Sequence, residues 1–220
     1  MVNRTYGQFC GLARALEIVG ERWALLIVRD LLVGPRRFSD LRNGLPRIPT
    51  NILAARLKEL EQAGVVERRI LPRPAASIVY ALTARGSDLE EAVLALGRWG
   101  ARALDVHRPD EIVTADSLVM ALRTTFQPGA ATGLSVSYEL RFGAIVLHAR
   151  VVDGLLTAAE GALPGADLVM TTGPALRPLL AGELSPAEAI ATGGVQLIGD
   201  PALLTTFARL FRILPGSAAA

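Results

Sequence analysis

Residues 47–69 read RIPTNILAARLKELEQAGVVERR, and this stretch decides the fold of the chain. Its leucines recur at helical spacing and predict a helix that Pro49 opens in the first turn and Gly64 ends. One narrow apolar seam consists of Leu53, Leu57 and Leu60. The opposite face carries Asn51, Ala54, Ala55 and Lys58. Because these side chains are short, polar or basic, the face is suited to approach another molecule closely.

Three shorter helices are predicted before this stretch. The first runs from Leu12 to a stop at Gly20, and the third begins at Ser39, whose hydroxyl is expected to cap it. The second helix ends at Gly34-Pro35. Its buried face is expected to consist of Trp23, Leu26, Ile27 and Leu31.

A hairpin and one long helix are predicted after the stretch. VVERRIL (65–71) and SIVYAL (77–82) are strand-like pieces joined by a segment with two prolines and an arginine, so they predict a hairpin with a basic tip. Thr83 is expected to cap the long helix. This helix has more apolar surface than a terminal helix needs, which favours contact with a second copy of the chain. We assign this dimerisation stripe to Leu89, Val93, Leu96, Trp99 and Ala103.

Four helices, a hairpin and a further helix are the plan of a winged helix-turn-helix domain, in which the helix before the hairpin enters the DNA major groove. Such a helix needs short side chains for approach, an amide that can pair with adenine, and cations for phosphates. We therefore predict DNA-binding residues on this helix and on the hairpin tip: Arg47, Thr50, Asn51, Ala54, Arg56, Lys58 and Arg73.

Their roles differ. Asn51 would read a base, Arg47, Arg56 and Lys58 would hold phosphates, and Arg73 would reach the minor groove. A solvated helix face is the alternative for the whole set, and an internal salt bridge is the alternative for Arg56, which lies nearest the apolar seam. The adjacent Arg36 and Arg37 either contact phosphate or are simply solvated.

The distribution of charge indicates two domains with different tasks. Residues 1–108 hold 17 basic and 11 acidic residues, whereas residues 109–220 hold 6 basic and 10 acidic residues, and we place the domain boundary between them. A basic domain attracts nucleic acid or an anionic membrane surface, and an acidic domain is repelled by both. A lipid carrier that docks on membranes through its basic half therefore remains an alternative to a DNA-binding protein.

The second half reads as an α+β domain. LSVSYELRF (134–142) and AIVLHARVV (144–152) alternate apolar and polar residues and predict a half-buried hairpin. Shorter strands are predicted at residues 166–171 and 195–199. The remaining helices are expected to open at Thr172 with Pro174, at the capping box of Ser185 and Glu188, and at Asp200-Pro201.

The first half strongly resembles the HxlR-type winged helix regulators, a branch near the MarR group. The resemblance covers about residues 8–104 and rests on CGLARALEIVGERWALLIVRDLLVGPRRFSDLRNGLP (10–46), the leucine-seamed helix, LEQAGVVERR (60–69) and YALTARGSDL (80–89). Glu21-Arg22 stands where the family usually has Gly-Lys, and Pro49 stands where a Ser or Thr commonly caps the helix. The resemblance implies a transcription regulator, and we expect a homodimer on a pseudo-palindromic operator in double-stranded DNA.

The second half looks similar to the sterol carrier protein type of lipid-binding fold. The similarity is carried by ADLVMTTGPALRPLLAGELSPAEAI (166–190) and GGVQLIGDPALLTTFARLF (193–211). It implies a sheet covered by helices with an apolar cavity between them, which would suit an apolar small-molecule or lipid ligand that regulates DNA binding. The alternative is that this half serves only in packing and dimerisation.

Cys10 is the one cysteine of the chain. Some HxlR-type proteins sense electrophiles through a cysteine near the matching position, so the resemblance implies a redox or electrophile sensor. The alternative is a small buried hydrophobe that packs the first helix.

Catalysis and membrane insertion are not expected. The chain has two histidines, His107 and His148, and no spacing typical of metal ligands, so we expect neither an enzyme nor a bound metal or cofactor. The first twenty residues contain Arg4, Arg14 and Glu17 and no continuous apolar stretch that resembles a signal peptide, and no uncharged apolar run reaches the roughly 18–20 residues that span a bilayer. A cytoplasmic protein is therefore expected.

Overall fold

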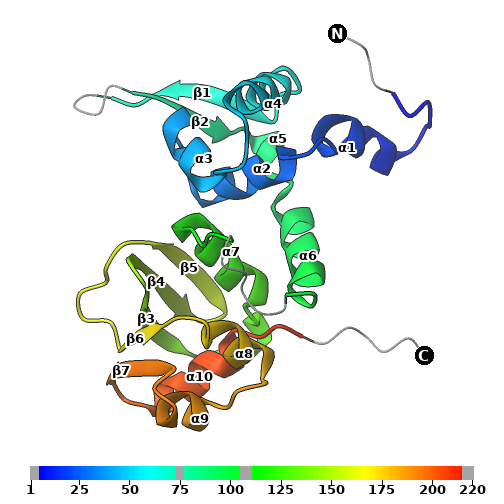
Figure 1. Cartoon of the computed structure of the whole chain (residues 1–220). Coiled ribbons are helices and arrows are strands. Elements are labelled where there is room, and N and C mark those ends of the chain that lie inside the picture. The colour runs from blue at the N-terminus through cyan, green and yellow to red at the C-terminus, as the bar shows by residue number, and fades with distance from the viewer. Residues whose placement is uncertain (1–4, 73–76, 105–110, 215–220) are drawn as a thin grey trace. The chain divides into compact units, whose positions relative to one another are not determined.

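The computed structural model describes residues 5–72, 77–104 and 111–214 (Figure 1). The chain folds into two compact units, Met1–Val93 and Leu94–Ala220. The expected boundary after residue 108 falls among residues 105–110, which lie outside the described part of the chain.

The first unit has the predicted order of four helices and a hairpin (Figure 1). The helices are α1 (Gly11–Val19), α2 (Ala24–Val33), α3 (Phe38–Gly44) and α4 (Thr50–Gln62). Strands β1 (Val66–Ile70) and β2 (Ile78–Leu82) pair antiparallel. Two further helices follow, α5 (Ala84–Ser87) and α6 (Glu90–Ala101), and the boundary between the two units falls within α6.

The leucine seam of α4 lies in the core of this unit. Leu53, Leu57 and Leu60 are each at most 1% exposed, as the helical spacing predicted. They pack with buried residues of α2, α3 and β1. The buried side of α2 differs from the prediction, because Leu26 is 39% exposed and Ala24 and Val28 are buried beside Ile27 and Leu31.

Three predictions about helix ends are wrong. Thr83 caps only the short α5, where its hydroxyl accepts the N–H of Gly86, and the chain turns before α6 begins. The turn brings Gly86 so close to the residue before β1 that a Cβ there would lie 2.1 Å from the carbonyl oxygen of Val65. Ser39 lies within α3, where Asp40 accepts the backbone N–H of Arg37 instead. Pro49 precedes the first residue of α4.

The second unit is built on a five-stranded sheet with the order β5-β4-β3-β6-β7. The strands are β3 (Ser135–Phe142), β4 (Ile145–Val152), β5 (Leu155–Glu160), β6 (Leu168–Thr172) and β7 (Val195–Gly199). Neighbouring strands run antiparallel except β3 and β6, which are parallel. The predicted hairpin and β7 are therefore present, and β5 was missed.

Helices cover one face of this sheet. They are α7 (Ala115–Thr125), α8 (Leu176–Ala181), α9 (Pro186–Ala191) and α10 (Ala202–Leu210), with a short 3-10 turn η1 (Pro128–Ala130). Tyr138 of β3 packs edge-on against Phe207 of α10, with ring centroids 5.1 Å apart. The capping box of Ser185 and Glu188 opens α9 as predicted. Helix α7, which Thr114 caps, was not predicted.

Candidate nucleic-acid interface

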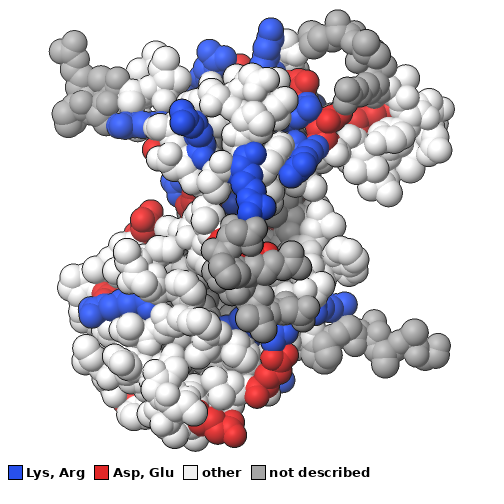
Figure 2. Space-filling view, viewed as in Figure 1, with Lys and Arg blue, Asp and Glu red and all other residues white. Residues whose placement is uncertain are grey.

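The candidate interface is the exposed face of α4. The seam turns one side of the helix into the core, and the side chains on the other side are exposed: Thr50, Asn51, Ala54, Ala55 and Lys58. Arg47, three residues before the helix, is exposed as well. Figure 2 shows Lys and Arg side chains gathered on the visible face of the first unit, the upper part of the view. The face of α4 is therefore accessible and contains small side chains, an amide and a cation.

Lys58 and Asn51 are available for an outside partner. Among the residues that the structure describes, neither side chain makes a hydrogen bond or an ion pair within the chain. An exposed ammonium group without a carboxylate partner can pair with a phosphate without first breaking an internal contact. Both residues lie on the exposed face where the sequence placed them. Their contact with DNA stays a prediction.

Arg56 is placed differently. Its side chain is 15% exposed, and its Nη2 lies 3.1 Å from Oε2 of Glu21. Its Nη1 contacts the carboxylate of Glu59, one turn further along α4. This arrangement corresponds to the internal salt bridge that the sequence left open as the alternative.

The hairpin presents arginines that are paired within the chain. Arg68 lies 3.3 Å from the carboxylate of Glu61 and stacks over the ring of Tyr80 at 5.7 Å. Arg69 lies 2.6 Å from Glu67. Arg73, the residue predicted to reach the minor groove, lies outside the described residues.

Arg36 and Arg37 mark the entry to α3. The backbone of Arg36 pairs with that of Tyr80 in an isolated bridge, with N···O distances of 3.0 and 2.7 Å. Arg36 is thereby attached to the hairpin and is half-buried, whereas Arg37 is exposed. The structure keeps the phosphate-contact hypothesis for Arg37 open.

The predicted dimerisation stripe divides into two parts. Leu89 and Val93 pack against the core of the first unit. Leu96 and Trp99 are 51% and 73% exposed, and Ala103 is exposed too. A second exposed apolar surface, which the sequence-based prediction did not include, lies on α1, where Leu12 is 68% exposed. The apolar spacing of the first helix was the sequence signal for this surface, but spacing alone does not show which side of the helix the rest of the chain covers.

Cys10 is exposed, so the interpretation as a buried hydrophobe is wrong. It directly precedes α1, and the backbone N–H groups of Ala13 and then Leu12 lower the pKa of its thiol by favouring the thiolate. A thiolate at a helix N-terminus reacts faster with electrophiles.

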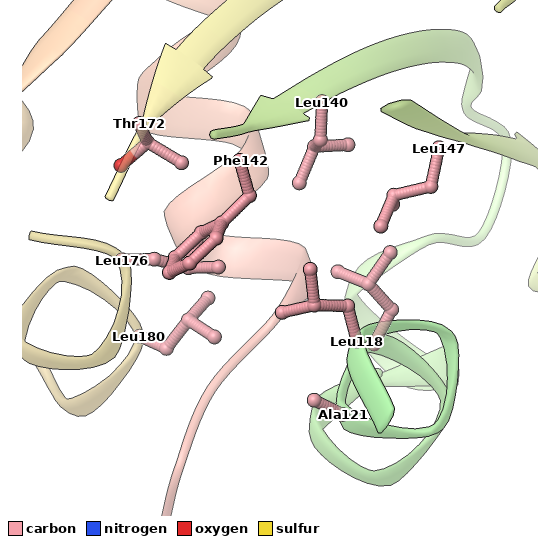
Figure 3. Close-up of a pocket in the computed structure, with 9 residues that line it drawn as sticks. Leu118, Ala121, Leu140, Phe142, Leu147, Thr172, Leu176 and Leu180 are labelled. Atoms are coloured by element: carbon pink, nitrogen blue, oxygen red, sulfur yellow. The ribbon is translucent and has the colours of Figure 1, made fainter. Parts of the chain in front are cut away.

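The second unit contains an apolar cavity between the sheet and its helices (Figure 3). Figure 3 shows Phe142 pointing into it from β3, with Leu118 of α7 and Leu180 of α8 nearby. Its volume is about 10 Å³, which is room for about one water molecule. A wider hollow of about 390 Å³ lies at the ends of β6 and β7, but glycines and threonines contribute much of its lining. Neither is a ready-made lipid site.

Two ionisable side chains of the sheet, His148 and Glu139, are engaged in structural contacts. His148 lies opposite Glu139 across β3 and β4, and its Nδ1 is 3.0 Å from the carbonyl oxygen of Gly161. Glu139 accepts the N–H of Leu163, and this bond together with the Arg141 guanidinium lowers the pKa of its carboxyl. His107 lies outside the described residues, and no group of potential metal ligands occurs within the described ones.

Comparison with known proteins assigns the N-terminal half of the chain to a family. The model of the HxlR-like helix-turn-helix family matches residues 18–108. The HTH-type transcriptional regulator YodB of Bacillus subtilis is 39% identical over 85 residues, which cover 39% of this chain and 76% of YodB. The chain belongs to the HxlR-like helix-turn-helix family. A second regulator of that organism, YvaP, is 38% identical over 92 residues, which cover 42% of this chain and 85% of YvaP.

These relatives are transcriptional regulators and not enzymes. The solved structure of reduced YodB from B. subtilis has 35% sequence identity and a TM-score of 0.39, with 43% of this chain and 94% of that chain covered. The family model ends at residue 108 and does not include the five-stranded sheet. The sterol-carrier type of the second unit therefore stays a prediction. In the described part of the chain, no helix combines the length and apolar character that crossing a membrane requires.

The Cys10 geometry predicts a reactive thiol. Because helix N–H groups stabilise the thiolate, the rate of alkylation by iodoacetamide should reach half its maximum at a pH below the ordinary cysteine pKa of about 8.5. Mass spectrometry across a pH series measures this rate at a single site. In urea the helix is lost, and the pH of half-maximal alkylation should return to the ordinary value. The prediction is contradicted if the folded and the unfolded protein reach half-maximal alkylation at the same pH.

Proposed function

We propose that this protein is a DNA-binding transcriptional regulator whose helix α4 enters the major groove of its operator. The observation that carries the proposal is the exposed, uncommitted face of α4, which lies opposite a fully buried leucine seam. Membership of the HxlR-like helix-turn-helix family supports it. A helix fixed on one side and accessible on the other is what groove binding requires.

The residues of this face suit different contacts. Asn51 offers an amide for a bidentate pair with adenine, and Ala54 is small enough for close approach. Lys58, Arg47 and Thr50 suit phosphate oxygens, and Arg37 and Arg73 are further candidates for phosphate and minor-groove contacts. Phosphate contacts supply affinity, and the base contact supplies sequence preference.

We further propose that the protein acts as a homodimer on a pseudo-palindromic operator. Two exposed apolar side chains one turn apart on α6, Leu96 and Trp99, support this, since a contiguous exposed apolar patch marks a protein–protein contact. The exposed apolar side of α1, with Leu12, is a second candidate surface. Two copies of α4 would read half-sites about 34–36 Å apart, or a multiple of this spacing.

For the second unit we favour the role of a packing module over that of a ligand sensor. The apolar cavity of about 10 Å³ supports this choice, because a lipid needs several hundred cubic ångströms. A sensor role would require α7 and α8 to move apart. A membrane-docking lipid carrier is the least supported function, since it gives no task to the exposed face of α4.

Removal of single side chains from α4 tests the DNA interface. Lys58→Ala should weaken binding to every sequence and lower the slope of log K against log salt by about 1, because one phosphate contact is lost. Asn51→Ala should cost about 1–3 kcal/mol and blur sequence preference. Fluorescence anisotropy with duplexes selected by the protein from a random pool measures both effects.

Arg150→Ala is the matched control, because it removes an exposed positive charge from β4 of the second unit. Arg150→Ala should change neither the slope of log K against log salt nor the sequence preference of binding. Unaltered binding in both α4 variants would remove this assignment.

A charge within the exposed stripe of α6 tests the dimer. Trp99→Glu should convert the protein to a monomer, because burying an unpaired carboxylate is strongly unfavourable. Sedimentation equilibrium measures the mass of the particle. Arg98→Glu, which adds a carboxylate at a neighbouring exposed position of α6, should leave the dimer intact. A monomeric wild-type protein, or a Trp99→Glu dimer of unchanged affinity, would rule out this surface.

The small cavity predicts that the second unit does not bind fatty acids. The fluorescence of cis-parinaric acid should not increase in a saturable way when wild-type protein is added at micromolar concentration. Leu147→Ala, which enlarges the cavity, should create weak apolar binding at a cost of about 2–5 kcal/mol in stability. Saturable binding by the wild-type protein, or an apolar compound that co-purifies with it, would favour the sensor instead.

A further inference from the structure

We propose that Arg56 is a positioning residue that ties helix α4 to the turn between α1 and α2 and makes no contact with DNA. The proposal rests on the function proposed above, in which α4 is the recognition helix. It changes the role assigned to a cation that the sequence alone placed among the phosphate contacts.

The position of Arg56 on the helix separates it from the candidate DNA face. Successive residues of an α-helix are about 100° apart, so Arg56 and Lys58 point in directions that differ by about 160°. The exposure of the two residues agrees with this geometry, because the Arg56 side chain is 15% exposed and Lys58 belongs to the exposed residues. A duplex that Lys58 contacts lies on the far side of α4 from Arg56.

The charge of Arg56 is already compensated. Its guanidinium lies between two carboxylates, with Nη2 3.1 Å from Glu21 and Nη1 in contact with Glu59. A phosphate that approached Arg56 would be repelled by both carboxylates. Arg56 therefore cannot supply the electrostatic attraction that a phosphate contact provides.

Glu21 projects from a turn whose backbone is tightly constrained. Gly20 closes α1, and a Cβ at this position would lie 2.4 Å from the carbonyl oxygen of Leu16. Trp23 opens α2 with a φ of 81°, a conformation that non-glycine residues rarely adopt. The guanidinium of Arg22 lies 5.0 Å from the Trp23 ring centroid. Such a turn can hold a carboxylate at a fixed place.

The ion pair therefore limits rotation of α4 about its own axis. The leucine seam holds the helix against the core, but leucines are non-directional and tolerate small rotations. A hydrogen-bonded guanidinium is directional. Its attachment to Glu21 determines where Asn51 and Lys58 point on the opposite side of the helix.

Neutralising each partner of the pair tests the role of Glu21. If Glu21 is only a nearby charge, or if it anchors Arg56, the change in DNA affinity has opposite signs. If Glu21 were only a nearby negative charge, Glu21→Gln would reduce repulsion of DNA and tighten binding. If Glu21 anchors Arg56, Glu21→Gln should weaken binding roughly fivefold, which is within the usual range for residues that couple indirectly to a site. The probe is a duplex that the wild-type protein selects from a random pool.

The full comparison uses the intact protein with Glu21→Gln, Arg56→Gln and the double variant. We expect both single variants to weaken binding and the double variant to be no weaker than either one, because they break the same contact. The slope of log K against log salt should stay at the wild-type value in all three. Lys58→Ala, which lowers the slope by about 1, shows that the assay detects a lost phosphate contact.

Two results would overturn the inference. One is a slope lowered by about 1 in Arg56→Gln, which identifies a phosphate contact. The other is unchanged or tighter binding in Glu21→Gln. If Arg56→Gln fails to fold, the sign of the Glu21→Gln effect decides, because Glu21 is 34% exposed and less important for packing. If the wild-type protein selects no duplex, the proposed function fails first and this inference fails with it.

Discussion

The structure of the first unit depends on the burial of three leucines along one side of α4. Leu53, Leu57 and Leu60 are at most 1% exposed, and each fully buried leucine contributes about 1.5–3 kcal/mol relative to an exposed one. Because this seam holds one side of the helix in the core, the other side must face outward. The same contacts thus stabilise the fold and present the candidate DNA-binding face, so stability and function cannot be separated at these positions.

Sequence periodicity predicted the elements whose signal is local. The α4 seam, the hairpin of β1 and β2, and strand β7 follow from spacing within single segments. The break between α5 and α6 does not, because it depends on the approach of Gly86 to Val65 across the fold. Strand β5 has a weak alternation of its own and exists through its pairing with β4. Contacts between distant segments therefore decided the break between α5 and α6 and the existence of β5.

The candidate site also contains some features that local spacing predicts and others that depend on distant residues. Exposure of Asn51 and Lys58 follows from the helical period once the seam is known, so the sequence could place them. The environment of Arg56 depends on Glu21, a residue 35 positions earlier in the chain. The position of Arg56 beside the leucine seam left an internal salt bridge open as an alternative, but nothing in the local spacing pointed to Glu21 as a partner. The exposure of Cys10 was equally undetermined, because an isolated thiol suits a core and a surface alike.

The packed second unit restricts how an apolar molecule could regulate DNA binding. A ligand shifts a conformational equilibrium only if it binds one state more tightly than the other. With a cavity of about 10 Å³ between α7, α8 and the sheet, the observed state offers an apolar ligand almost no contact area. Any such ligand would have to bind a different, opened state, and its affinity would be reduced by the low population of that state. Electrophile chemistry at Cys10 has no such cost, because the thiol is exposed in the observed state. Of the two predicted routes of regulation, only the one through Cys10 therefore requires no opened state.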